Sequence, residues 1–555
     1  MKSRMKKIIS MGLAAAMIMS LAACGQEGNK EVSKQSSESK VESSVAESSS
    51  AVQESSVEVD PYEATEYPES VSVFMGLIAS KIKEGEEDYN ASASFRLMEE
   101  LTGTHIEWKL QDDYDQKFQL ALVSRKFDDV IIGNWKTMAG GAEQAAKDGV
   151  ILNLSDYAEY MPNFMEFTRN NPDIAKEYLS ADGQIYYLPY IRKDKELSIS
   201  QGMLMRTDWL DKLGLDVPTD AESLYNVLVA FKTQDPNGNG EADEIPMSSK
   251  GIRTKLLGMF GTADSFYLDD GKVMYGPMTE NYSDALEYLA KLYAEGLYDE
   301  EYVMLDRSNF LGKVTNNQVG MGWDYQPSAI HRTMVEKGDT TFQFVGIPWL
   351  ENDEGVSVSV NAADIQRTTA ACAAITTSCE NPEAVLKWLD TFYSEEAIEI
   401  MNYGEEGVTF EKVNGEYVYT DYITNNPDPD KSLDVMLDLE IASINGHFPE
   451  LQAWGAYKQK LTKEGMASIE TWATADKSMI LPSLTFIAEE NEKITNIMSQ
   501  VSTLVSEKFD KIIMGQESID VLDDVRATIT KMGIEEVLSI YQTAYERYNT
   551  IILAE

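Results

Sequence analysis

The chain has 555 residues, of which 93 are Asp or Glu and 47 are Lys or Arg, and its formal net charge at pH 7 is −46. This charge would repel a phosphate backbone, which makes nucleic acid a poor partner. Hydrophobic residues make up 43% of the sequence, as in a globular protein, and the length corresponds to two or three domains.

Residues 1–23 have the pattern of a bacterial signal peptide. A basic start precedes an apolar run, Ile8 to Ala23, which is too short and too rich in small residues for a typical spanning helix. The run ends in LAAC, which resembles a lipobox and implies cleavage before Cys24 and a diacylglyceryl group on its sulfur. We therefore expect a lipid-anchored (palmitate-type) protein on the outer face of the cytoplasmic membrane, as in a Gram-positive bacterium. The alternative is an ordinary signal peptide followed by an incidental cysteine.

Residues 24–66 are predicted to form a disordered tether that begins at the lipidated cysteine. Ser33–Ser56 contains eleven serines interleaved with Glu, Lys and Val, and almost nothing large and apolar. Such a segment cannot bury enough surface to offset the entropy lost on ordering. The tether would hold the folded body away from the membrane.

Strands and helices alternate along the body that follows. Hydrophobic periodicity predicts strands at 71–76, 105–110 and 128–133, and helices at 92–102, 116–124 and 140–149. Later come an extended segment at 183–192, a strand and helix at 202–215, helices from 217 and at 282–295, a strand at 318–326 and a helix at 382–393. The C-terminus is predicted to be helical at 483–514, 516–532 and 535–548, with Gly515 and Gly533 between the helices. The alternation indicates an α/β fold with a mostly parallel sheet.

Two cysteines lie in the body, and both are predicted to be free thiols. Cys372 and Cys379 are seven residues apart in one apolar stretch, TTAACAAITTSC. This setting favours buried thiols over a disulfide.

Six stretches, in order along the body, resemble the large lipoprotein subgroup of extracellular solute-binding protein family 1, the binding components of carbohydrate ABC importers. They are GGAEQAAKDGVILNLSDY, DGQIYYLPYIR, RTDWLDKLGLDVPT, DPNGNGEADEIP, LAKLYAEGLYDEE and WLDTFYSEEAIEIMNYGEEGVTF. The resemblance implies a two-lobed periplasmic-binding-protein-like fold with hinge crossovers near 188–200, 365–375 and 470–485. The N-terminal lobe would comprise 67–190 and about 370–470, and the C-terminal lobe 191–369 and about 475–555.

The stretch DPNGNGEADEIP has the front half of an EF-hand calcium loop, but its twelfth position is Pro246. Relatives that take up alginate-type oligosaccharides carry a similar loop with calcium bound. The resemblance implies a structural Ca²⁺ site in this loop. Its ligands would be the side-chain oxygens of Asp235, Asn237, Asn239, Asp243 and Glu244 and the backbone carbonyl oxygen of Glu241. The alternative is an Asn-Gly turn with solvated acids.

Sugar rings are bound by aromatic platforms and planar polar groups, and open α/β sheets bind ligands at strand ends. In maltodextrin-type relatives the loops after two matching strands carry ligand contacts. Those loops hold Asn134 and Trp135 in the first lobe and Trp323, Asp324 and Tyr325 in the second. Three further candidate ligand contacts lie on or near the predicted crossovers: Tyr190, Arg192 and Trp472. Arg192 could instead be an ion-pair partner within the hinge. Trp209 and Trp388 lie on helical faces and are predicted to be core residues.

We therefore expect a monomeric, membrane-anchored substrate-binding component of an ABC importer. It would bind an oligosaccharide between its lobes and deliver it to the permease subunits by lobe closure. Two alternatives stay open: a surface protein that feeds a membrane sensor, and a binder of a non-sugar solute such as a peptide. The sequence has no G-x-S-x-G, H-E-x-x-H, P-loop or G-x-G-x-x-G motif, so we do not expect an enzyme.

Overall fold

The computed structural model describes residues 60–554 except 137 and 139. The chain divides into two units, Met1–Glu58 and Val59–Glu555, and the described residues belong to the second. The predicted signal peptide, Cys24 and most of the predicted tether lie outside the described residues.

The last residues of the expected tether are ordered, which corrects the sequence-based boundary. Helix α1 (Pro61–Ala64) follows a cap at Asp60. The buried Lys387 donates from Nζ to the carbonyl oxygens of Tyr62 and Thr65 at 2.7 and 2.9 Å. Composition could not show this, because the partner lies more than 300 residues away in the sequence.

A six-stranded sheet has the order β14-β4-β11-β3-β1-β2. β1 pairs in parallel with β2 and β3, and β11 runs antiparallel between β3 and β4. Its strands are β1 (Ser70–Gly76), β2 (His105–Gln111), β3 (Val130–Gly133), β4 (Leu188–Arg192), β11 (Thr368–Ile375) and β14 (Leu451–Gln452).

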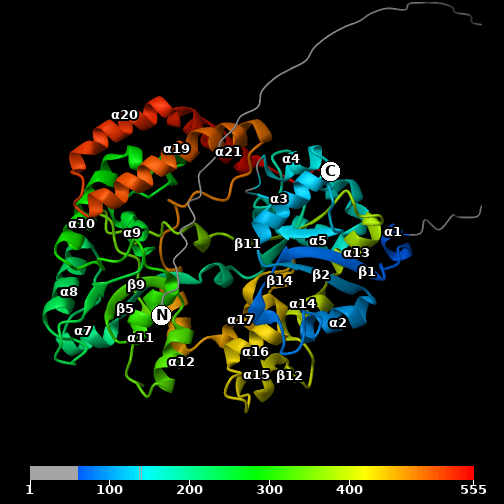
Figure 1. Ribbon diagram of the computed structural model, residues 1–555, viewed down its shortest axis with the longest axis horizontal. Helices are drawn as coiled ribbons and strands as arrows, with labels where there is room; N and C mark the ends of the chain where they lie inside the picture. Colours follow the sequence, from blue (N-terminus) through cyan, green and yellow to red (C-terminus); the bar gives the residue numbers. More distant parts are fainter. Residues whose placement is uncertain (1–59, 137, 139, 555) are drawn as a thin grey trace, which may run out of the picture. The chain divides into compact units, whose positions relative to one another are not determined.

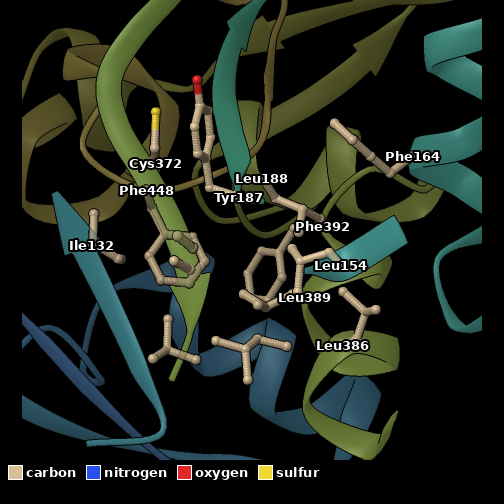
Figure 2. Close-up of a cluster of buried hydrophobic side chains, with 14 of the residues drawn as sticks. Ile132, Leu154, Phe164, Tyr187, Leu188, Cys372, Leu386, Leu389, Phe392 and Phe448 are labelled. Atoms are coloured by element: carbon tan, nitrogen blue, oxygen red, sulfur yellow. The ribbon is translucent and has the colours of Figure 1, made fainter. Parts of the chain in front are cut away.

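Helices cover this first sheet and bury its apolar side chains. They are α2 (Ala93–Thr102), α3 (Tyr114–Ser124), α4 (Gly141–Lys147), α5 (Pro162–Asn170), α6 (Pro172–Ala175), α13 (Pro382–Thr391) and α14 (Glu395–Tyr403). Figure 2 shows Leu386, Leu389 and Phe392, in and just after α13, packed with Phe448 against the sheet. The hydroxyl of Tyr187 and the thiol of Cys372 point away from this cluster. Both cysteines are free, as predicted.

A second, four-stranded sheet has the order β10-β5-β9-β6. Its strands are β5 (Gln201–Arg206), β6 (Ile245–Met247), β9 (Val319–Tyr325) and β10 (Phe344–Gly346). The helices around it are α7 (Thr207–Leu213), α8 (Ala221–Thr233), α9 (Ile252–Lys255), α10 (Glu280–Ala294), α11 (Arg307–Thr315), α12 (Ser328–Glu336) and α18 (Lys463–Ala473). Trp209 of α7 and Trp388 of α13 are 1% exposed, so both are core residues as predicted. Figure 1 shows the two sheets as separate groups, with β5 and β9 in one and β1 and β2 in the other.

Smaller elements complete the body. Two hairpins are formed by β7 (Phe266–Asp269) with β8 (Lys272–Tyr275), and by β12 (Phe410–Val413) with β13 (Glu416–Tyr419). Short helices follow at α15 (Asp421–Thr424), α16 (Leu433–Glu440) and α17 (Trp454–Tyr457), and the chain ends in α19 (Ala488–Ile513), α20 (Leu522–Met532) and α21 (Ile534–Thr550). The helical C-terminus was predicted, but 483–487 and 516–518 are not helical.

Three segments connect the two sheets: 193–200, 347–367 and 453–462. The resemblance implies the second and third near 365–375 and 470–485, and the structure differs at both. Residues 368–375 are β11 itself. α18 already lies on the second sheet, where the backbone amide of Gly346 donates to Ser468 Oγ at 2.7 Å. Residues 463–470, expected in the first lobe, therefore pack on the second sheet.

Glu177 holds the chain where it returns to the first sheet. Its carboxylate is 5% exposed and accepts from the backbone amides of Arg367 and Thr368 at 2.9 Å, and from the Thr368 hydroxyl at 2.9 Å. A buried charge is tolerated when hydrogen bonds replace its hydration. Lys136 Nζ donates to the same hydroxyl at 2.8 Å, so the loop after β3 is tied to the start of β11.

A tryptophan of α18 lies directly on a glycine of β5. Trp472 is fully buried and donates from its indole nitrogen to the carbonyl oxygen of Met203 at 3.1 Å. A Cβ atom on Gly202 would lie 2.1 Å from the Trp472 ring. This contact lets α18 approach the second sheet after the third connecting segment.

Gly202→Ala is therefore expected to lower the free energy of unfolding by about 1–3 kcal/mol or more, because the added methyl forces the indole to move. Gly312→Ala is the matched control, since a Cβ at this position in α11 meets nothing within 4 Å. Urea unfolding of both variants makes the comparison. Equal stability of the two variants would contradict the packing described for α18.

Candidate ligand-binding site

Side chains at the carboxyl ends of strands define the candidate site. Asn134 and Lys136 follow β3 in the first sheet, and Tyr325 is the last residue of β9 in the second. Open α/β sheets bind ligands at such edges. Asn134 is exposed and Lys136 is partly exposed.

The other predicted residue after β3 is part of the core. Trp135 is 2% exposed, and its indole nitrogen donates to the carbonyl oxygens of Ile131 at 3.3 Å and Cys372 at 3.1 Å. Its ring meets the Phe118 ring edge-on at 5.7 Å. The indole thus joins β3 to β11 and leaves almost no surface for a ligand in this structure.

Two of the three predicted crossover residues are also buried. Tyr190 is 1% exposed and donates from its hydroxyl to the carbonyl oxygen of Ser443 at 2.6 Å. Trp472 covers Gly202, as described above. Arg192 is partly exposed, and its Nη1 donates to the carbonyl oxygen of Gln366 at 3.2 Å. Among residues 60–554, no carboxylate forms an ion pair with Arg192 within 4 Å.

The end of β9 combines an exposed aromatic ring with a charged pair. Tyr325 is 47% exposed. The Asp324 carboxylate, 5% exposed, accepts from Arg307 Nε and Nη2 at 2.7 and 3.0 Å. The Arg307 guanidinium carbon lies 5.3 Å from the centre of the Tyr325 ring. A carboxylate held in this bidentate way fixes the guanidinium beside the ring, which favours a rigid platform.

Trp323 lies two residues before Tyr325 in β9. It is 9% exposed and meets the Trp349 ring at 5.4 Å. A Cβ on Gly251 would lie 3.0 Å from Trp323 Cδ1, so the glycine permits close approach of the backbone after β6. The predicted ligand contact Trp323 is therefore mostly buried, in the core around the second sheet.

Tyr457, which sequence reasoning missed, lies near Arg192 and Tyr325. Burial raises the pKa of Tyr457 to about 12, and a hydrogen bond to Gln326 and the positive charge of Arg192 oppose this rise. The Trp454 and Tyr457 rings stack at 6.0 Å in α17. The structure therefore brings together residues from β4, β9 and the third connecting segment. The aromatic pair in WGAY is the sequence signal that could have indicated it.

The predicted calcium loop is closed by its own side chains. Asp235 has φ +46°, and its carboxylate accepts from the backbone amides of Gly238 at 2.9 Å and Gly240 at 3.1 Å. The amide nitrogens of Asn237 and Asn239 each donate to Asp243 Oδ1 at 2.9 Å. These bonds, with a third from Gln318, hold the pKa of Asp243 below its usual value.

One carboxylate oxygen of the loop lacks a partner. Glu244 Oε1 is buried with no hydrogen-bond partner. Desolvation raises the pKa of Glu244, and the charges of Asp235 and Asp243 add to this rise. A cation would relieve both effects, so the residues fit calcium. Among the described residues no three acidic, His or Cys side chains converge as a metal site, so the Asn oxygens and the Glu241 carbonyl would have to complete the shell. The Asn amides would need to rotate by half a turn to do so.

The chain belongs to the bacterial extracellular solute-binding protein family, whose pattern matches residues 81–399. The fructooligosaccharide ABC transporter substrate-binding protein FusA of Streptococcus pneumoniae is 26% identical over 510 residues, 83% of this chain and 88% of FusA. Lipoprotein LipO of Bacillus subtilis is 28% identical over 358 residues, 61% of this chain and 68% of LipO.

Solved structures share the fold. The alginate-binding protein AlgQ2 without calcium ion matches with a TM-score of 0.70 at 23% identity, over 87% of this chain and 99% of AlgQ2. FusA in complex with kestose matches with a TM-score of 0.69 at 23% identity, over 87% and 99% of the two chains. The predicted two-lobed α/β fold is thereby confirmed. In residues 60–554, no helix has both the length and the apolar character needed to cross a membrane.

Trp135→Ala is expected to destabilise the protein by about 3–5 kcal/mol, because it leaves a cavity in the core and removes the two hydrogen bonds that the indole nitrogen donates. Tyr325→Ala, which removes an exposed ring, should change the free energy of unfolding by less than about 1 kcal/mol. Urea unfolding followed by circular dichroism measures both. A small effect of Trp135→Ala would show that this indole is not the core residue described here.

Proposed function

We propose that this protein is the membrane-anchored substrate-binding component of an ABC importer and that its ligand is an oligosaccharide. The observation that carries the proposal is the platform at the end of β9, where the exposed Tyr325 lies beside Arg307 and its partner Asp324. An aromatic face with fixed donors suits the apolar face and the hydroxyls of a sugar ring. The names of FusA and of its complex with kestose support this substrate class.

The two sheets would act as the two lobes. Residues 67–192 and 368–452 surround the first sheet, and residues 201–346 and 463–550 surround the second, with the three connecting segments as the hinge. A sugar held by Tyr325 on one side and by the loop of Asn134 and Lys136 on the other would stabilise a closed form. Closure is favoured only by as much as the ligand binds the closed form better than the open one. Permease subunits would then recognise the closed, monomeric protein.

The anchor and the metal are parts of the same proposal. Lipidation of Cys24 would keep the protein on the outer face of the membrane, in keeping with the extracellular family and the lipoprotein relative LipO. Calcium in the loop 235–244 would be structural. The structure of a FusA EF-hand mutant in complex with fructo-nystose and that of AlgQ2 without calcium ion support a metal loop in relatives.

Calorimetric titration of residues 59–555, which keep α1 and its contacts with Lys387, with kestose, maltotriose and longer neutral oligosaccharides tests the proposal, and micromolar binding to one class is expected. Tyr325→Ala and Arg307→Ala should each weaken that binding at least tenfold, which corresponds to about 1.4 kcal/mol. Tyr422→Ala is the control, because Tyr422 is 42% exposed on the distant α15. If the folded protein binds no oligosaccharide, the proposed function is wrong.

Removal of calcium is expected to lower the melting temperature without changing which sugar binds. Chelation leaves Glu244 Oε1 without a partner, and Glu244→Gln should abolish the difference between chelated and calcium-loaded protein. Glu222→Gln, on the exposed first turn of α8, is the control variant. Identical melting with and without chelator, together with no calcium by elemental analysis, would refute the metal assignment.

A further inference from the structure

The last helices of the chain are attached to elements around the second sheet. α19 packs on α10, and three of its side chains belong to the apolar core of that sheet: Phe509, Ile512 and Ile513. In α21, Gln542 Oε1 accepts from the backbone amide of Val273 in β8 at 2.9 Å. The Tyr541 ring of the same helix stacks on Phe266 of β7 at 3.9 Å. These contacts make α19 and α21 part of the second-sheet side of the body.

Immediately after α21 the chain returns to the first sheet. Ile551 and Leu553 pack against the apolar core of that sheet. The backbone amide of Ala554 donates to the carbonyl oxygen of Gly183 at 3.0 Å. Figure 1 shows α21 running from α20 toward the helices of the first sheet. Residues 551–554 therefore form a strap, which is a fourth link between the two sheets beside the three connecting segments.

The strap is seated on a glycine in a turn. Gly183 has φ +80°, and a Cβ atom there would lie 2.4 Å from the carbonyl oxygen of Ile552. Within the turn, the Gly183 amide donates to the Ser180 carbonyl oxygen and the Ser180 amide donates to the Gln184 carbonyl oxygen, each at 3.0 Å. Glycine alone combines this backbone conformation with so close an approach. The first-sheet side therefore supplies an ordered acceptor for the strap.

The end of α21 faces both sides of the body. Arg547 pairs with Glu490 of α19, from Nη1 at 3.2 Å and from Nη2 at 2.7 Å. Its Nη2 also donates to the carbonyl oxygen of Thr485 at 3.0 Å. Lys176, which directly follows α6 on the first-sheet side, places its Nζ 5.6 Å from the centre of the Tyr548 ring. The bidentate ion pair fixes the last turn of the helix, and the cation over the ring links that turn to the first-sheet side.

The seat of the strap lies away from the three connecting segments. These segments leave β4 after Arg192, enter β11 at Thr368 and leave β14 after Gln452. The three positions share one edge of the first sheet, because β4 pairs in parallel with β14 and antiparallel with β11. Gly183 precedes β4, so it lies toward the opposite end of this strand, which is about 16 Å long. A rotation of the lobes about the connecting segments must therefore shift or release the strap.

We propose that the strap restrains the opening and closing of the two lobes by tying the C-terminal helices to the first sheet away from the hinge. Its contact is small enough to be released while the lobes stay folded, because it consists of one backbone hydrogen bond and two partly buried apolar side chains. A cavity of about 730 Å³ adjoins the strap and is also lined by residues of α5 and α6, so the strap has room to shift. The inference rests on the lobe motion of the proposed function but not on the identity of the ligand.

The distance between the lobes in the ligand-free unit, residues 59–555, tests the restraint. Glu100 of α2 and Glu287 of α10 are exposed, so cysteines that replace them can carry one spin label on each lobe. Cys379→Ser removes the partly exposed native thiol from this background. Double electron–electron resonance then gives the distribution of distances between the two labels, and we expect a narrow distribution when the strap is intact.

Two variants release the strap, one from each side of the contact. Leu553→Ser removes an apolar contact and should at least double the width of the distance distribution, whereas Ile552→Ser should not, because Ile552 is 79% exposed. Gly183→Ala closes the seat and should have the same effect as Leu553→Ser. Gly149→Ala is its control, since Gly149 also has a positive φ, +67°, but a Cβ there meets nothing within 4 Å.

Hydrogen exchange followed by mass spectrometry shows whether the strap is seated. Peptides that contain residues 551–554 should exchange at least tenfold more slowly in the wild type than in Leu553→Ser or Gly183→Ala. If exchange shows release in a variant whose distance distribution stays that of the wild type, the inference is wrong. Fast exchange in the wild type, or slow exchange in both variants, would also overturn it. Thermal melts confirm that the lobes stay folded. No sugar is present, so a failure of the proposed ligand class leaves these results standing.

Discussion

The two-sheet organisation depends on one buried carboxylate. Glu177 receives hydrogen bonds from the first residues of the chain that return from the second sheet, and these bonds stabilise its buried charge. Because β11 begins at this point and lies between β3 and β4, the order of the first sheet follows from it. The same threonine hydroxyl receives Lys136, so the loop that faces the candidate site is positioned by the return of the chain.

Much of the fold could be predicted from sequence because the pattern is local. The strands 71–76 and 105–110 and the helix 92–102 coincide with β1, β2 and α2 within one or two residues. The connecting segments could not be placed this way. The sequence TTAACAAI fits a connecting segment between the lobes as well as a strand within a sheet. Only the pairing of Cys372 with Gly133 and Pro189 shows that it is a strand of the first sheet. The position of α18 likewise depends on a contact of Trp472 with Gly202, which lies far away in the sequence.

The candidate site was harder to predict than the fold, and tryptophan shows why. Sequence position after a strand suggested both Trp135 and Trp323 as sugar contacts. Both are buried in the structure: the Trp135 indole donates to two carbonyl oxygens, and the Trp323 ring packs against Trp349. Hydrophobic periodicity indicates which face of an element is buried. The exposure of a side chain at the end of a strand, however, depends on loops from distant parts of the sequence that pack over it.

A crystal structure with the first oligosaccharide found to bind would test the central claim most directly. The account predicts electron density for the sugar between the two sheets, with one ring against Tyr325 or Trp323 and other contacts from the loop that holds Asn134 and Lys136. A sugar that contacts residues around one sheet alone, or that lies elsewhere on the body, would contradict the account of binding by lobe closure.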